Sequence, residues 1–299
     1  MPEKGPLVFL DYDQAELDAA YDQAAYAPNR EQLIERRIGD SATARRRIGE
    51  PERVAYGVGE IEWLDIYRCA GAAAPVFVFI HGGAWRGGRS KDYAGPAEMF
   101  LAAGAHYVVP DFAWVHDVGG SLMVLADQVC RAVAWIYENV ARLGGDPNQL
   151  YIGGQSSGGH LAAVALTTDW QRQFCLPADL IKGGMCISGM YDLVPVRLSA
   201  RNRYIRFDDA TVAALSPIRH LNRLHAPLVV AYGSCETPEF QRQNREFAAA
   251  VEASGKQARL LVGEHYNHFE LPDTLGNPYG LLGRAALEMM GLTTGGGAQ

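Results

Sequence analysis

Residues 154–158 (GQSSG) fit the pattern G-x-S-x-G, which can present a serine as a nucleophile. A predicted strand over 150–154 precedes this stretch, and a predicted helix over 158–168 follows it. The strand must turn sharply into the helix, and glycines two positions either side of the serine remove Cβ atoms that would clash. A glycine-rich turn with incidental serines is the alternative. With the expected strand and helix on either side, the pattern predicts Ser156 as the nucleophile of acyl transfer, with Ser157 contributing its backbone N–H.

A second glycine-rich stretch, residues 81–85 (HGGAW), directly follows the apolar run at 76–80. Acyl transfer builds negative charge on the carbonyl oxygen, and backbone N–H groups stabilise it where the chain can approach closely. A Gly-Gly turn alone fits a plain loop better than an oxyanion hole. Paired with the serine motif, it predicts an oxyanion hole formed by the N–H groups of Gly82, Gly83 and Ser157.

A serine hydroxyl needs a histidine base, which an acid must orient. Where the serine lies at a strand-to-helix turn of this kind, the chain order is serine, acid, histidine. His265 and His268 both follow the last predicted strand, and we prefer His268 because it lies deeper in the loop and precedes the apolar Phe269. As a pair at i and i+3 they could be metal ligands, but no third ligand cluster accompanies them. No metal and no other cofactor is therefore predicted. The remaining histidines are excluded by their positions: His81, His106, His116, His160, His220 and His225.

The acid is expected in the turn after the predicted strand 227–232, where Glu236 and Glu239 compete. Thr237 as N-cap, with Pro238 at the first helical position, would place Glu239 in the first turn of a helix, where a carboxylate offsets the macrodipole. Glu236 remains in the turn and is the predicted triad acid. Its alternative is an ordinary surface carboxylate.

Short apolar or β-branched runs alternate with helix-length segments from about residue 54, and this alternation predicts an α/β sheet. The predicted strands are 54–58, 61–67, 76–80, 106–110, 150–154, 184–188, 227–232 and 258–262. The predicted helices are 91–103, 121–143, 158–168, 238–254 and 279–290.

The chain is expected to form a single domain over 1–290. Residues 1–50 are polar and helix-rich, with capping-box patterns at Asp13 and Asn29, and they predict an N-terminal helical cap segment. The arginines at 36–37 and 45–47 could form a binding patch, but the interspersed acids and the helical spacing favour a solvated helix face. Residues 190–225 interrupt the α/β alternation and are expected to form an insertion serving as a lid or pocket wall. The tail 291–299 is expected to be flexible.

The composition of the chain argues against nucleic-acid-binding and membrane-spanning proteins. The 299 residues carry 27 Lys and Arg against 34 Asp and Glu, a net charge of −7, and this acidic balance argues against nucleic-acid binding. No apolar stretch approaches the roughly 20 residues of a membrane span. Five scattered cysteines without C-x-x-C spacing and an N-terminus without a secretory pattern indicate a cytoplasmic protein with reduced thiols.

Together these motifs resemble the α/β-hydrolase kynurenine formamidases (arylformamidases) and their HGG-x-W esterase relatives, over about residues 12–290. The resemblance implies an α/β-hydrolase fold with a mostly parallel eight-stranded sheet flanked by helices. It also implies that the triad falls on Ser156, Glu236 and His268. Two residues depart from the pattern, since Gln155 stands where histidine is frequent, and Glu236 where several relatives have Asp. The stretches that carry the resemblance are HGGAW at 81–85, GQSSGGH at 154–160, SGMYDL at 188–193, SPI at 216–218, PEFQRQ at 238–243 and NHF at 267–269.

The sequence thus predicts a serine hydrolase that cleaves a small acyl amide or ester through an acyl-enzyme. The expected substrate is an aryl formamide resembling N-formylkynurenine. A small-acyl carboxylesterase of a catabolic pathway is the alternative, and a hydrolase-fold protein that binds a ligand without turnover is a third. Expected partners are a small-molecule acyl substrate and, for the oligomeric state, a homodimer. Four aromatic residues are candidates for the pocket wall, with core packing as their alternative: Trp85, Trp114, Tyr191 and Tyr204.

Overall fold

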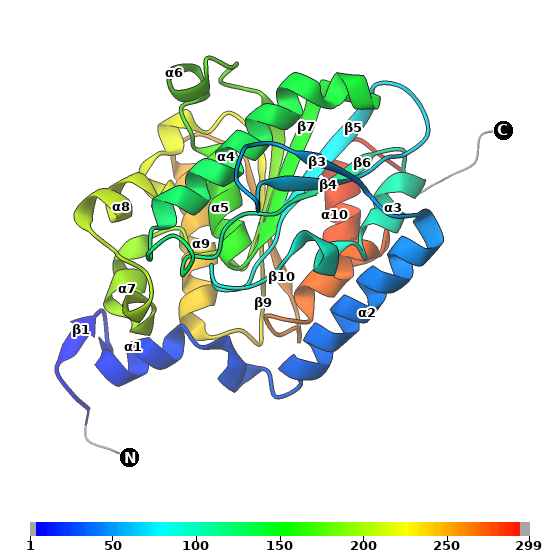
Figure 1. The fold of residues 1–299 in the computed structure, drawn as a ribbon. Helices are drawn as coiled ribbons and strands as arrows, with labels where there is room; N and C mark the ends of the chain where they lie inside the picture. Colours follow the sequence, from blue (N-terminus) through cyan, green and yellow to red (C-terminus); the bar gives the residue numbers. More distant parts are fainter. Residues whose placement is uncertain (1–3, 294–299) are drawn as a thin grey trace.

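A twisted, mostly parallel sheet forms the centre of the molecule (Figure 1), which we describe from a computed structural model that covers residues 4–293. The strand order is β10-β9-β8-β7-β5-β6-β4-β3, and all neighbours from β10 to β6 are parallel, whereas β4 and β3 are antiparallel. The predicted mostly parallel eight-stranded sheet is confirmed. The strands are β3 (Glu52–Ala55), β4 (Trp63–Tyr67), β5 (Ala74–Ile80), β6 (His106–Pro110), β7 (Gly145–Gln155), β8 (Ile181–Ile187), β9 (Leu228–Gly233) and β10 (Ala258–Gly263).

Helices cover both faces of the sheet. Residues of α4 (Leu122–Asn139), α5 (Ser157–Leu166) and α9 (Pro238–Ala253) share one apolar cluster with the sheet, and α3 (Ala97–Ala102) and α10 (Leu281–Met289) share the other. Four of the five predicted helices are present. The segment predicted as a single helix over 91–103 is instead divided into a 3-10 turn, η2 (Ser90–Tyr93), and α3, with Gly95-Pro96 between them. A proline fixes φ and favours the start of a helix, which explains the division.

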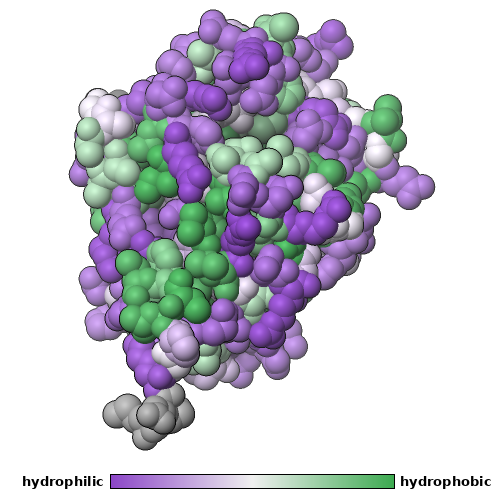
Figure 2. All heavy atoms as spheres, turned by 90° about the vertical axis from the view of Figure 1, so that its left-hand side faces the viewer, coloured by the Kyte–Doolittle hydropathy of each residue, from purple (hydrophilic) through white to green (hydrophobic). Residues whose placement is uncertain are grey.

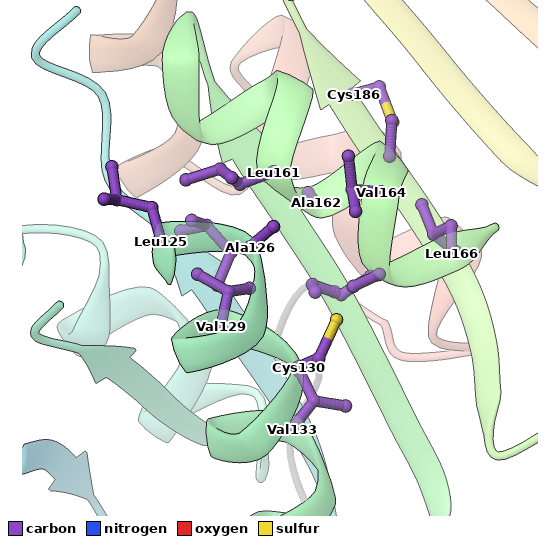
Figure 3. Packing of buried hydrophobic residues seen from close by; sticks show 14 of the residues in the cluster. Leu125, Ala126, Val129, Cys130, Val133, Leu161, Ala162, Val164, Leu166 and Cys186 are labelled. Atoms are coloured by element: carbon purple, nitrogen blue, oxygen red, sulfur yellow. The ribbon is translucent and has the colours of Figure 1, made fainter. Parts of the chain in front are cut away.

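The packing of α4 against α5 shows why these segments are helical (Figure 3). Apolar residues recur on α4 at three- and four-residue spacing, so that they form one face. This face meets α5, all ten of whose residues are buried, because α5 packs against α4 and against strands β7 and β8. The residues in Figure 3 include Leu125, Ala126, Val129, Cys130 and Val133 of α4 and Leu161, Ala162, Val164 and Leu166 of α5. The helix that follows Ser156 is therefore fixed on all sides.

The N-terminal segment forms a small hairpin, β1 (Leu7–Phe9) and β2 (Tyr12–Asp13), followed by α1 (Gln14–Ala20), η1 (Gln23–Tyr26) and α2 (Arg30–Ile48). The capping box at Asp13 is present as predicted. The one at Asn29 is wrong, because the Asn29 side chain makes no cap hydrogen bond and instead donates to Glu270 Oε1 at 2.8 Å. The hairpin was not predicted.

Buried hydrogen bonds fasten this segment to the start of α9. The Tyr21 hydroxyl donates to Glu239 Oε1 at 2.8 Å, and Gln23 Nε2 donates to Thr237 Oγ1 at 3.0 Å. Thr237 Oγ1 in turn donates to the carbonyl of Ala20 at 2.7 Å. The segment is therefore joined to the turn that carries Glu236.

Residues 190–225 contain short helical pieces, as expected for an insertion without a clear period. They are α7 (Leu193–Leu198), η4 (Ala200–Arg203), α8 (Asp209–Ala214), η5 (Pro217–Arg219) and η6 (Leu221–Arg223). The remaining elements are η3 (Val140–Leu143), α6 (Trp170–Phe174) and η7 (Leu271–Gly276). At the C-terminus the Leu292 side chain packs against the core, and residues 294–299 of the predicted flexible tail lie outside the described residues.

An apolar patch lies on the surface that β1 and α7 share, and Figure 2 shows hydrophobic residues gathered on the lower part of this face. Its exposed members are Leu7, Val8, Leu10 and Leu198. Patches of this kind are typical of interaction sites. Within residues 4–293, no helix is both long and apolar enough to cross a membrane.

Two buried histidines make the stability of the fold depend on pH. Burial lowers the pKa of both His81 and His160 to about 4, from 6.5 in an unfolded chain. Their contribution to stability is thus fully present above pH 6.5 and is lost as the pH falls towards 4. We expect the free energy of unfolding in urea to fall between pH 6.5 and 4.5, by up to about 1.4 kcal/mol per pH unit for each histidine. His160→Gln should make this slope shallower, whereas His225→Gln, at an exposed position, should not. Equal slopes in the wild type and His160→Gln would contradict the prediction.

Candidate active site

Ser156 lies in a strained turn between β7 and α5. Its φ of 59° and ψ of −123° are unusual for a residue with a side chain, and such a conformation costs about 1–3 kcal/mol. The turn is held by the Ser156 N–H, which donates to the carbonyl of Ile187 on β8 at 2.8 Å. The strain presents the serine side chain at the carboxyl end of the sheet, where a cavity opens.

Glycines let the turn approach its neighbours closely. A Cβ atom on Gly158 would lie 2.0 Å from the carbonyl oxygen of Ile80, and one on Gly82 would lie 2.8 Å from the carbonyl oxygen of Gln155. The Cβ atom added to Gly82 would also lie 3.3 Å from the Ser156 Cβ atom. A larger residue at either glycine would push the turn away from the end of β5. The loop that follows β5 therefore packs directly on the turn that holds Ser156.

This loop, residues 81–85, is itself tightly positioned. The His81 ring is buried, stacks on Phe112 with ring centroids 4.3 Å apart, and has its Nδ1 2.9 Å from the carbonyl oxygen of Gly82. Gly83 and Ala84 line the same cavity as Ser156. Ser157 begins α5, whose N-terminus carries partial positive charge. The loop and the start of α5 thus both lie beside Ser156.

Glu236 and His268 form a buried hydrogen-bonded pair. Glu236 follows β9 and His268 follows β10, and parallel strands bring both to the same edge of the sheet. Glu236 Oε2 lies 2.8 Å from His268 Nδ1, while Glu236 Oε1 accepts from Ser188 Oγ at 2.5 Å and from the Gly233 N–H at 2.7 Å. The carboxylate is thus fixed by three partners, which orient the imidazole with Nε2 towards the cavity.

Gln155 meets the other nitrogen of this imidazole. Its Nε2 lies 3.1 Å from His268 Nε2 and donates to the His268 carbonyl oxygen at 3.2 Å. Within residues 4–293 there is no direct hydrogen bond between Ser156 and His268. Gln155, Ser156 and His268 all line the cavity. The Gln155 amide therefore occupies the acceptor nitrogen that a nucleophilic serine would use.

Glu239 and His265, the alternatives to Glu236 and His268, lie at other positions. Thr237 does cap α9, since its Oγ1 accepts from the Phe240 N–H, and Pro238 is the first helical residue. Glu239 is fully buried, and its carboxylate forms an ion pair with Arg242 at 2.6 Å. Its role is therefore structural and goes beyond offsetting the macrodipole in the first turn of α9. His265 is exposed.

A cavity of about 890 Å³ opens over Ser156 and His268. Its walls come from the N-terminal segment, the loop at 81–85 and the insertion at 190–225, which agrees with the expectation that the insertion forms a wall. Of the four aromatic candidates, Tyr204 lines this cavity.

The other three aromatic candidates are not among the residues that line the cavity, and their positions fit the alternative of core packing. Trp85 is buried, at 2% exposure. Trp114 donates its indole N–H to the Gly88 carbonyl at 2.9 Å. Tyr191 is fully buried and stacks on Phe247 with ring centroids 4.0 Å apart. Large aromatic side chains fill cores as readily as pockets, so residue type alone did not separate the two roles.

Three residues of the site were missed as candidates. Ser188 follows β8, and the rule that strand ends share one edge of the sheet could have indicated it. Arg86 and Arg201, which line the cavity, had no such signal because their segments have no regular period.

Comparisons with known proteins identify the family of this chain. Residues 64–182 match the BD-FAE family model. The kynurenine formamidase of Danio rerio is 30% identical over 246 residues, which are 80% of this chain and 81% of that protein. Esterase LipC of Mycobacterium tuberculosis is 30% identical over 272 residues, 81% of this chain and 62% of LipC. The chain belongs to the α/β-hydrolase group of esterases and formamidases.

The α/β-hydrolase fold predicted from the sequence is likewise confirmed among solved structures. A protein from Silicibacter sp. TM1040, proposed to be a thioesterase, superimposes with a TM-score of 0.79 at 24% identity, over 89% of this chain and 97% of that one. Within the described residues of this α/β-hydrolase, no group of three His, Cys, Asp or Glu side chains could hold a metal ion.

Gly82→Ala tests the close packing of the loop on the turn. The added methyl group would meet Gln155 backbone and side-chain oxygens at 2.8 and 2.6 Å, so the free energy of unfolding in urea should fall by about 1–3 kcal/mol. Gly39→Ala is the matched control, because it lies in α2 with nothing within 4 Å of the new atom. It should leave stability unchanged or raise it by up to about 1 kcal/mol. Equal stability of the two variants would show that the loop and turn are not tightly packed.

Proposed function

We propose that this protein is a serine hydrolase in which Ser156 is the nucleophile, His268 the base and Glu236 the residue that orients it. The observation that carries the proposal is the buried Glu236–His268 hydrogen bond of 2.8 Å beside a serine in a strained turn. A carboxylate on Nδ1 fixes the tautomer that leaves Nε2 free to accept a proton.

The reaction would begin when Ser156 Oγ attacks the substrate carbonyl and its proton passes to His268 Nε2. Gln155 gives up its hydrogen bond to this nitrogen as the serine approaches. The N–H groups of Gly82, Gly83 and Ser157 would hold the oxyanion of the tetrahedral intermediate. The C–N or C–O bond then breaks, and the amine or alcohol leaves with the proton from His268. Water, deprotonated by His268, hydrolyses the acyl-enzyme and regenerates the Ser156 hydroxyl.

An aryl formamide resembling N-formylkynurenine is the substrate we favour, and the similarity to the Danio rerio kynurenine formamidase over most of both chains supports it. A small-acyl carboxylesterase is the second candidate, supported by the similarity to esterase LipC. Binding without turnover is disfavoured because Ser156, Glu236 and His268 all lie at one edge of the sheet. The cytoplasmic location and the homodimeric state of the protein remain predictions.

The two substrate classes are separated by measuring kcat/KM on N-formyl-L-kynurenine, p-nitrophenyl acetate and p-nitrophenyl butyrate. We expect the formamide to exceed both esters by tenfold or more, which corresponds to about 1.4 kcal/mol of transition-state preference. Faster turnover of the esters would favour the carboxylesterase. Ser156→Ala should lose nearly all activity, while Ser157→Ala, which removes the neighbouring hydroxyl but keeps the backbone N–H, should cost far less. Full activity of Ser156→Ala would disprove the mechanism.

Ser188→Ala tests how Glu236 is held. Removing the 2.5 Å hydrogen bond loosens the carboxylate but leaves the bond from Gly233, so kcat on p-nitrophenyl acetate should fall about tenfold with little change in KM. Glu236→Gln should be more severe, by about 10³–10⁴ in kcat, because the amide favours the wrong imidazole tautomer. An unchanged kcat in Ser188→Ala would mean that Gly233 alone positions the acid.

A further inference from the structure

The cavity over Ser156 has a charge opposite to that of the whole chain. Its lining contains five arginines and three carboxylates, whereas the chain carries a net charge of −7. Arg30 pairs with Glu31, and Arg203 pairs with Asp18. Three cavity arginines have no carboxylate within 4 Å among residues 4–293: Arg37, Arg86 and Arg201.

Arg201 is held in place by neutral groups. Its Nη1 donates to the Tyr204 hydroxyl at 2.7 Å and its Nη2 donates to the carbonyl of Tyr21 at 3.0 Å. The guanidinium carbon lies 5.6 Å from the ring centroid of Trp85. In the part of the chain that the structure describes, the Arg201 Nε is buried without a hydrogen-bond partner. The guanidinium is thus fixed in direction, but its positive charge is not balanced.

Arg86 approaches the same place from the other wall. It directly follows the loop at 81–85, and its guanidinium carbon lies 4.5 Å from the ring centroid of Tyr204. Tyr204 therefore contacts two guanidinium groups, one above its ring and one at its hydroxyl. Unbalanced positive charges that share one partly enclosed surface favour the binding of an anion, because an oppositely charged ligand relieves their repulsion and accepts their N–H groups.

We infer that Arg86 and Arg201 bind a carboxylate that the substrate carries outside its scissile acyl bond, on the Tyr204 side of the cavity. The inference rests on the proposed hydrolase function and assigns to these two arginines the recognition of a carboxylate, a group that N-formylkynurenine carries. A guanidinium fork matches a carboxylate in two parallel hydrogen bonds. A monoanion also fits better than a phosphate dianion, which the three lining carboxylates Asp18, Asp22 and Glu31 would repel more strongly.

The test compares 3-acetoxybenzoate with its methyl ester, methyl 3-acetoxybenzoate, because the scissile acetyl ester is the same and only the charge differs. We expect the wild type to prefer the anion by at least about tenfold in kcat/KM, the effect of one charge-assisted hydrogen bond. Arg86→Gln and Arg201→Gln should each remove most of this preference by raising KM for the anion, with the methyl ester little affected.

Arg89→Gln is the matched control, because the Arg89 guanidinium stacks on Trp114 at 3.8 Å and lies outside the cavity lining. It should keep the full preference. If Arg201→Gln fails to fold because it loses its bonds to Tyr21 and Tyr204, the exposed Arg86 still decides the question. Equal kcat/KM for the two substrates in the wild type, or a preference that survives in Arg86→Gln, would overturn the inference and leave the serine mechanism intact.

Absence of hydrolysis of both esters would count against the proposed function instead. In that case the binding of benzoate and benzamide to the Ser156→Ala variant, measured by calorimetry, tests the anion site without catalysis. Tighter binding of benzoate that is lost in the Ser156→Ala, Arg86→Gln double variant would support the carboxylate site. Equal binding of benzoate and benzamide would overturn it.

Discussion

The site depends on the contact between two stretches of backbone, the turn at Ser156 and the chain that leaves β5. Gly158 lies so close to the Ile80 carbonyl oxygen that no side chain fits between them, and Gly82 approaches the carbonyl of Gln155 in the same way. This packing keeps Ser156 in a conformation that an isolated peptide would leave. Because α5 is buried against α4 and the sheet, the core that stabilises the fold also maintains the strain in the turn.

The hydrogen bond between Glu236 and His268 depends on a different part of the molecule. Its carboxylate is fixed by β8 and β9 through Ser188 and Gly233, and the next residue, Thr237, is bonded to the N-terminal segment. Glu239, one turn further on, accepts from Tyr21 of the same segment. The acid thus lies between the sheet and the cap, and both determine where the imidazole points.

The sequence predicted the parts of the site that follow strands. Ser156, Glu236 and His268 follow β7, β9 and β10, and parallel strands place their carboxyl ends at one edge, so order along the chain was enough. The walls could not be predicted in this way. Arg201 comes from an insertion without a regular period, and Arg37, expected on a solvated helix face, lines the cavity. Asn29 fits a capping pattern, yet its side chain donates a hydrogen bond to Glu270, which lies 241 residues further along the chain.

The bonds between the N-terminal segment and the start of α9 have a consequence for how substrate enters. Swinging the segment outward would break the hydrogen bonds of Gln23 and Tyr21 directly beside the acid, so opening the site in this way would also disorder it. Substrate and product can instead exchange through the open side of the cavity while the segment stays in place. Differences in sequence along that open side can change which molecules are admitted while the reaction itself stays the same.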